Sequence, residues 1–360
     1  MQSLSSVTRK LSFYFSLWSQ FLIDKFSGRN LGHYWNSELS QCESNKCLRV
    51  VFATPHKSAG SEQIVDELLS YFDSRQTRWP ENVTLLARDC SVSQQGDCLL
   101  VFKSLPKLFD REQFKRLGLI ICDQLDVFWD RLDNFDFVVV TSSPELCQLV
   151  STKTQKVYFI PEFEPFRLFK VGSEQIKKDV STAKDIMWHG GLYSLSELDG
   201  IIPILAELAD LEGGFSFWII GGTMKKRVEK FGLLSVEYRP WSENNLIEAS
   251  QNSRLALIPA RKSLKNSYLK PAARIRRLNS LGVIAIGDKR VPEVRRLSEN
   301  TGQPTVDYSN FCVDLLLGIY SDTVEINRLR YISFDFARQY HNPEITLNRW
   351  LHVLETEFSS

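Results

Sequence analysis

Two cations one helical turn apart, Lys270 and Arg274, flank the start of a helix predicted at residues 271–281. The proline at its start suits a first turn, because its missing N–H group is not needed there. A helix start also presents free N–H groups and about half a positive charge. Residues four apart share one helix face, so both cations could meet the same anion. The spacing predicts a diphosphate site; a solvated basic face that includes Arg276 and Arg277 is the alternative.

Two glycine pairs follow predicted strands in the same half of the chain. Gly190 and Gly191 come after strand 186–189, and Gly222 belongs to the turn after strand 215–220. Glycine lets such a turn tighten and lets a phosphate approach the backbone. Neither turn is a GxGxxG dinucleotide fingerprint or a GxxxxGK[ST] loop. Phosphate contacts and plain strand-to-helix turns both remain as interpretations.

Candidates for acid–base chemistry lie in the first half of the sequence. His56 follows the predicted strand 48–53, and an imidazole pKa near neutrality suits a general base. Asp123 and Asp126 follow a later strand and are alternative bases. We interpret this pair as structural or acceptor-binding groups rather than metal ligands, and we predict no metal site. The residues assigned to the acceptor side are Gly60, Ser61 and Lys103.

Short apolar runs alternate with helical stretches along the whole chain. Strands are predicted at 48–53, 83–87, 98–102, 119–122, 137–141, 157–160, 186–189, 215–220, 234–238, 255–258 and 283–286. Helices are predicted at 61–72, 108–117, 144–150, 200–211, 224–231, 244–252, 271–281 and 323–358. This alternation is typical of parallel strands with crossover helices. The sequence therefore predicts an α/β fold with two Rossmann-like domains facing across a cleft, with ligands beyond the carboxyl ends of the strands.

The predicted domain boundaries divide the chain into five parts. They are an N-terminal extension (1–45), a first Rossmann-like domain (46–168), a polar linker (169–184), a second Rossmann-like domain (185–322) and a helical tail (323–360). Within the extension, residues 7–26 would form an aromatic-rich amphipathic helix. This helix either packs on the first domain or lies at a membrane surface.

Composition excludes several classes of protein. The 360 residues carry 44 Lys and Arg against 43 Asp and Glu, and 43% of them are hydrophobic. Such a balance excludes a mainly disordered chain and a dedicated nucleic-acid binder. Seven scattered cysteines without a Cys-x-x-Cys pair indicate reduced thiols. We therefore predict a cytoplasmic protein, with peripheral contact at the inner membrane face through residues 7–26 as an option; the oligomeric state stays open.

Four segments resemble the C-terminal half of GT-B glycosyltransferases of the glycogen-synthase-like kind (glycosyl transferases group 1). They are IMWHGGL, FSFWIIGG, VEYRPWSENNLIEAS with the following LALIPA, and KPAARIRRLNSLGVIAIGD with the following VPE. The resemblance covers residues 183–300 and is looser in the first half, at HKSAGSEQIVDELLSYF and LIICDQLDVFW. It implies a metal-independent, hexosyltransferase-like enzyme of glycan or polysaccharide synthesis. Its second domain would hold a nucleotide-diphosphate sugar, its first a glycan or lipid-linked acceptor, and no further cofactor is implied.

The resemblance also implies roles for single residues. Trp241 lies where such enzymes line the nucleobase pocket, and Arg261 lies on a loop facing the cleft. Lys270 and Arg274 match a cationic pattern of some relatives. Glu293, in VPE, would either orient the donor or cap a helix. His189 would either touch a sugar hydroxyl or be a hydrogen-bonded residue at the end of its strand.

The sequence departs from the family pattern at the donor site. The first loop, HGGLYSLSELDG, has no cation where many relatives carry Arg and Lys. Leu269 and Arg277 stand where many relatives carry two glutamates. We therefore expect Lys270 and Arg274 to neutralise the diphosphate. A non-catalytic protein that binds a nucleotide or sugar remains an alternative, as does a sugar-nucleotide epimerase or phosphorylase on the same plan.

Overall fold

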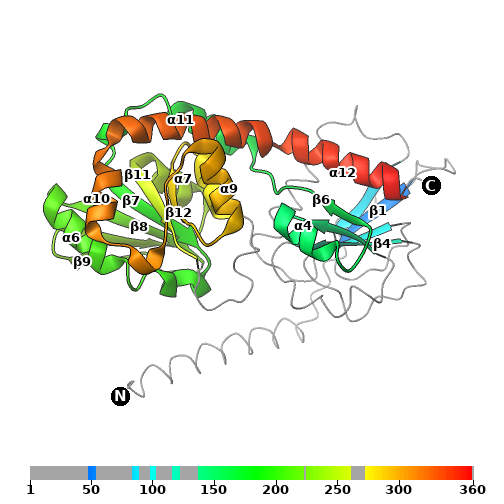
Figure 1. Cartoon of the computed structure of the whole chain (residues 1–360), viewed down its shortest axis with the longest axis horizontal. Helices are drawn as coiled ribbons and strands as arrows, with labels where there is room; N and C mark the ends of the chain where they lie inside the picture. The colour runs from blue at the N-terminus through cyan, green and yellow to red at the C-terminus, as the bar shows by residue number, and fades with distance from the viewer. Residues whose placement is uncertain are drawn as a thin grey trace, which may run out of the picture. The chain divides into compact units, whose positions relative to one another are not determined.

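The computed structural model describes four strands of the first half, Leu48–Ala53, Val83–Arg88, Cys98–Phe102 and Arg116–Ile121, and residues 137–222, 224–260 and 272–358. These residues contain two mainly parallel sheets (Figure 1). Within these ranges, no helix combines the length and the hydropathy of a segment that could span a membrane. The parallel strands that the sequence predicts are therefore present in both halves of the chain.

The first sheet has six parallel strands in the order β2-β1-β3-β4-β5-β6. Their bounds are Leu48–Ala53 (β1), Val83–Arg88 (β2), Cys98–Phe102 (β3), Arg116–Ile121 (β4), Phe137–Thr141 (β5) and Val157–Phe159 (β6). The predicted bounds of β1, β3 and β5 are confirmed to the residue. The helix predicted at 108–117 runs too far, because Arg116 and Leu117 already pair with Cys98 and Leu99 of β3.

The second sheet has seven strands in the order β13-β12-β11-β7-β8-β10-β9. Their bounds are Asp185–Gly190 (β7), Phe215–Gly221 (β8), Arg227–Phe231 (β9), Leu234–Arg239 (β10), Ser253–Ile258 (β11), Ala285–Asp288 (β12) and Thr305–Val306 (β13). All neighbours are parallel except β9 and β10. The central strands bury large side chains such as Trp188, Phe217 and Leu257. Burial of this kind is expected where helices cover both faces of a parallel sheet.

The described part of the chain contains nine α-helices, from α4 to α12. Their bounds are Pro144–Val150 (α4), Phe166–Gln175 (α5), Ile202–Glu212 (α6), Glu243–Asn252 (α7), Ala273–Ser280 (α8), Pro292–Thr301 (α9), Val313–Ser321 (α10), Thr323–Tyr340 (α11) and Pro343–Phe358 (α12), of which α4 follows β5. The sequence analysis does not predict α9, β13 or α10. The tail predicted as one helical stretch is two helices, because a new helix begins at Pro343.

The helix predicted at 224–231 is wrong, since this segment contains strand β9. β9 pairs antiparallel with β10, and Phe231 opposes Leu234 across a two-residue turn. Gly232 in this turn has a φ of 60°, which the short turns of hairpins require. The sequence signal for the hairpin was this glycine between two β-rich runs.

The segment predicted as a linker, 169–184, contains most of α5 rather than an extended connection. α5 packs on α8 and α11, and a Cβ added at Gly172 would lie 2.1 Å from the Ser280 carbonyl oxygen and 2.7 Å from the Phe334 ring. The buried Arg330 guanidinium reinforces this contact by donating to the Gln175 carbonyl oxygen at 2.7 Å. A cation at the end of α5 also complements the helix dipole. The five-part division of the chain stays a prediction.

Replacing Gly172 should therefore destabilise the protein. We expect Gly172→Ala to lower the free energy of unfolding by about 2 kcal/mol or more, because helix backbone must move to admit the methyl group. Gly318→Ala is the control, since Gly318 also lies in a helix and an added Cβ meets nothing within 4 Å. This control should be neutral or stabilising by up to about 1 kcal/mol. Urea unfolding measures both, and equal stabilities would contradict the close contact.

Candidate functional site

The candidate site lies at the carboxyl edge of the second sheet. β7 is central: its successor β8 lies on one side of it, and β11, which comes later in the chain, lies on the other. Such a reversal of strand order opens a crevice between the loops that leave the two strands. The loop after β7 and the start of α8, which follows β11, therefore meet at this point.

Close packing requires the glycines that end β7 and β8. A Cβ added at Gly221 would lie 2.7 Å from the Gly190 carbonyl oxygen. A Cβ at Gly190 would lie 2.7 Å from the Trp188 ring and 3.2 Å from Nη1 of Arg274. Gly222 has a φ of 43° and accepts a 2.9 Å hydrogen bond from the backbone N–H of the next loop, at position 241. Close packing therefore accounts for Gly190 and Gly221, and a positive φ accounts for Gly222, while a role in phosphate contact stays a prediction.

Trp241 lies beside the glycine turn through that backbone hydrogen bond to Gly222. Its side chain is half-buried and packs against the core. The loop that carries it is fixed by Asn245, whose side-chain amide donates to the Pro240 carbonyl oxygen at 2.8 Å. The structure therefore brings Trp241 to the same sheet edge as the glycine turns.

Helix α8 begins at Ala273, two residues later than the sequence predicts. Its first internal hydrogen bond runs from the Arg276 N–H to the Ala272 carbonyl oxygen at 3.0 Å. The N–H groups of Ala273, Arg274 and Ile275 consequently have no acceptor within the helix. Helix N–H groups of this kind favour an anion, and binding of a diphosphate at the start of α8 stays a prediction.

Glu293, in the first turn of α9, caps α8. Its Oε2 accepts the Ala272 N–H at 2.6 Å, and its Oε1 accepts from Nη1 of Arg276 at 2.6 Å. The side chain is 5% exposed, and this burial raises the pKa of the Glu293 carboxyl while Arg276 and the Ala272 N–H oppose the shift. Of the two roles considered for Glu293, the helix cap is the one that these contacts show.

The solvated basic face considered for Arg276 and Arg277 is wrong. Arg276 is fully buried, and its second ion pair reaches Glu162 at 3.1 Å. Arg277 donates through Nε to Glu164 at 2.8 Å. Both arginines therefore bind carboxylates that precede α5. The sequence signal for this was the pair of acids in PEFEP, which matches the two adjacent arginines.

Arg274, in the first turn of α8, lies at the crevice, and its side chain forms hydrogen bonds with other residues of the protein. Its guanidinium donates to Oε2 of Glu197 at 3.2 Å and to the Pro259 carbonyl oxygen at 3.1 Å. The Arg274 side chain is 29% exposed, whereas that of Glu197 is 3% exposed. The loop after β7 thus contributes a carboxylate that the sequence analysis missed. Arg274 is well placed to meet an anion while it also holds two loops together.

His189 forms a hydrogen bond inside the protein. Its Nε2–H donates to the Arg274 carbonyl oxygen at 3.1 Å, because a carbonyl oxygen can only accept. The side chain is buried, and burial lowers the pKa of His189 to about 3. The imidazole is therefore neutral at physiological pH, and the interpretation as a hydrogen-bonded residue at the end of its strand is confirmed.

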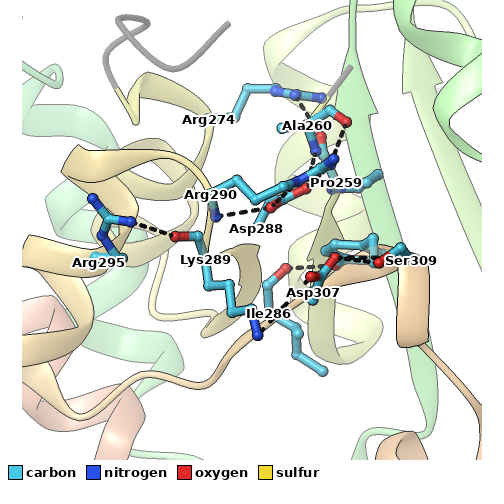
Figure 2. A network of polar contacts seen from close by, with 11 residues as sticks. Pro259, Ala260, Arg274, Ile286, Asp288, Lys289, Arg290, Arg295, Asp307 and Ser309 are labelled. Carbon is cyan, nitrogen blue, oxygen red and sulfur yellow. Dashed lines mark hydrogen bonds and ion pairs between the residues drawn. The ribbon is translucent and has the colours of Figure 1, made fainter. Parts of the chain in front are cut away.

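A second network fixes the exit of β11, as Figure 2 shows. Oδ2 of the buried Asp288 accepts the Ala260 N–H at 3.3 Å, and Arg290 binds the same carboxylate through Nε at 2.9 Å. Arg274 holds Pro259 from the other side. This clamp orients the backbone that leads into the loop where Arg261 was predicted to contact the donor. Asp288, the last residue of β12, was not predicted as a site residue from the sequence.

The other predicted site residues lie outside the part of the chain that the structure describes. They are His56, Gly60, Ser61, Lys103, Asp123, Asp126, Arg261 and Lys270. Leu269 and the amphipathic segment 7–26 also lie outside it. Among the described residues, no group of three or more His, Cys, Asp or Glu side chains is arranged to hold a metal ion.

Burial of a neutral His189 predicts a specific pH dependence of stability. The unfolded state binds a proton on this side chain below pH 6.5 but the folded state does not until about pH 3, so stability falls as pH falls through this window. Between pH 7 and pH 5 the loss from His189 should be about 2 kcal/mol. His189→Gln keeps a donor for the Arg274 carbonyl and should lose about that much less stability on acidification. Urea unfolding at both pH values tests this, and identical losses in the two proteins would show that His189 is protonated when folded.

Comparison with known proteins identifies the fold. A scan against protein-family models finds no match, and a search of curated proteins finds none. Solved structures do match. A glycosyltransferase from Rickettsia africae has a TM-score of 0.58 at 11% identity, over 88% of this chain and 100% of that chain. Anabaena HepE, solved with UDP and glucose, has a TM-score of 0.55 at 10% identity, over 86% and 100%.

A third match is an alpha-glucosyltransferase solved with UDP and DNA. Its TM-score is 0.55 at 13% identity, over 86% of this chain and 100% of that chain. At sequence identities this low, the structural matches establish a likeness of fold alone. The chain has the fold of the GT-B glycosyltransferases, as its sequence predicts.

Proposed function

We propose that this protein is a glycosyltransferase that moves a sugar from a nucleotide-diphosphate donor to an acceptor hydroxyl. The observation that carries the proposal is the match to GT-B structures that include complexes with UDP. Each match covers 86% of this chain and 100% of the other chain. The site supports it, because the start of α8, the Arg274 cation and two closely packed glycine segments lie at the same sheet edge. An epimerase or a phosphorylase finds no comparable support among these matches.

The donor diphosphate would bind at the start of α8. Sugar transfer breaks the anomeric C–O bond, and negative charge builds on the departing diphosphate. N–H groups and cations fixed at that position stabilise the transition state more than the ground state. The free N–H groups of Ala273 and Arg274, the Arg274 guanidinium and, from the sequence, Lys270 and Arg261 would supply this stabilisation. We propose that no metal ion is required, because the protein provides the positive charge.

Trp241 would contact the nucleobase, and Gly190, Gly191 and Gly222 would let the phosphates approach the backbone. His56, or else Asp123 or Asp126, would accept the proton of the acceptor hydroxyl. These catalytic assignments rest on the sequence. We further propose a glycan or lipid-linked acceptor bound by the first half of the chain, near Gly60, Ser61 and Lys103, and an enzyme of the cytoplasm.

A non-catalytic donor-binding protein is the second candidate. The observation in its favour is the ion pair of Arg277 with Glu164, since Arg277 stands where many relatives of the family have a glutamate. Both candidates bind the donor, so turnover separates them. Incubation with UDP-sugars should release UDP faster when a glycan acceptor is present if the protein is a transferase. Binding of UDP-sugar without transfer or slow hydrolysis would support the non-catalytic candidate.

The donor site predicts a charge-dependent affinity for UDP. Lys270→Ala and Arg274→Ala should each weaken UDP binding about tenfold or more, because each removes a charge-assisted contact with phosphate. Isothermal titration calorimetry with UDP, GDP and ADP measures the affinity, and thermal unfolding checks that each variant is folded. Arg328→Ala is the matched control, because Arg328 pairs only with its helix neighbour Glu325 among the described residues. Unchanged affinity in both site variants would overturn the assignment.

A further inference from the structure

The hairpin at the edge of the second sheet presents cations and apolar side chains together. β9 is the last strand in the sheet order and lies at its edge in Figure 1. We call the following residues the β9 surface: Lys225, Lys226, Val228, Lys230, Phe231 and Leu233. All six are exposed, with Val228 at 53%, Phe231 at 40% and Leu233 at 54%. In the pairing with β10, Val228 and Lys230 lie on one face of the sheet and Phe231 on the other, so these side chains flank the edge strand from both faces.

The three lysines of the β9 surface have no ion-pair partner in the described part of the chain. Arg227 differs from them, because it pairs with Glu229 at 2.9 Å and stacks over the Tyr238 ring at 3.7 Å. The one carboxylate of the strand is thereby neutralised within the protein. The charge left on β9 and the segment before it is positive, and the Asp210 carboxylate of α6 lies beside the turn.

The apolar side chains are held in place by the turn. Gly232 makes the turn, and Oδ1 of Asp210 in α6 accepts the Leu233 N–H at 3.5 Å. Leu211, the next residue of α6, is 60% exposed and extends the apolar area. Phe231 and Leu233 are therefore presented on either side of a turn that is anchored to the neighbouring helix.

A second copy of this chain does not fit the β9 surface. Pairing of two β9 edges would bring lysines of both copies together, and lysine on an edge strand is a device against such pairing. Prevention of strand pairing at the sheet edge, however, explains only the lysines. It leaves the exposed Phe231 and Leu233 without a role, since apolar side chains at an edge promote association. A partner must therefore offer both negative charge and an apolar phase.

We propose that the β9 surface binds an anionic membrane. The lysines would lie among negatively charged lipid headgroups, each adding to the attraction, while Phe231 and Leu233 enter the boundary between headgroups and acyl chains. A nucleic acid would satisfy the lysines but would leave both apolar side chains in water. The lipid surface is thus the partner whose chemistry matches the whole surface. This contact does not depend on the proposed activity.

Vesicle binding by the full-length protein tests the proposal. The vesicles are phosphatidylcholine alone or phosphatidylcholine with about one-third phosphatidylserine, and co-sedimentation measures the partition of the protein. The lysine variant is Lys225→Ala with Lys226→Ala and Lys230→Ala. Its matched control removes three other exposed lysines, on and after α5: Lys170→Ala with Lys177→Ala and Lys178→Ala. The wild type and the control should bind the anionic vesicles at least tenfold better than the lysine variant.

The apolar contribution has its own variant. Phe231→Ser should also weaken binding to anionic vesicles several-fold, whereas Tyr331→Ser, which changes a 62% exposed aromatic residue of α11, should not. Equal binding by the wild type and the lysine variant, or no preference for anionic vesicles, would overturn the proposal. So would a lysine-dependent affinity for duplex DNA with vesicle binding unaffected by Phe231→Ser, since that result identifies a nucleic-acid surface. UDP affinity of the lysine variant should stay at the wild-type value.

Discussion

The buried carboxylate of Glu293 is the interaction on which the candidate site depends. It accepts the N–H of Ala272, the residue before α8, and it neutralises Arg276, which is fully buried one turn later. A helix start without a side-chain cap of its own is thereby fixed by a residue from the next βα unit. Loss of Glu293 would leave Arg276 paired with Glu162 alone, and breaking a buried ion pair costs about 3–5 kcal/mol. The N–H groups that this cap leaves at the start of α8 are the ones that we propose to meet the donor diphosphate.

The three arginines of α8 divide into two roles. Arg276 and Arg277 turn toward carboxylates that precede α5, so their charge stabilises the fold. Arg274 lies at the sheet edge, where its guanidinium joins the loop after β7 to the exit of β11. An incoming diphosphate would meet a cation that is already oriented by Glu197 and Pro259. Preorganisation of this kind lowers the cost of charge stabilisation during transfer.

The fold could be predicted from the sequence because parallel strands are short apolar runs with buried side chains on both faces. The bounds of β1, β3 and β5 followed directly from such runs. The failures were long-range. β9 is exposed on both faces, so its periodicity resembled a helix, and only its pairing with β10 defines it. The burial of Arg276 depends on Glu162, 114 residues away, which helical spacing on α8 could not reveal.

The central claim is that the start of α8 receives the diphosphate of a nucleotide donor. Titration of the protein with UDP, followed by NMR of ¹⁵N-labelled alanine, tests it most directly. The amide signal of Ala273 should shift strongly as UDP binds, because its N–H is free to meet a phosphate oxygen, while the buried Ala249 and Ala337 should shift little. UDP binding without a shift at Ala273, or with larger shifts at the two buried alanines, would contradict the account.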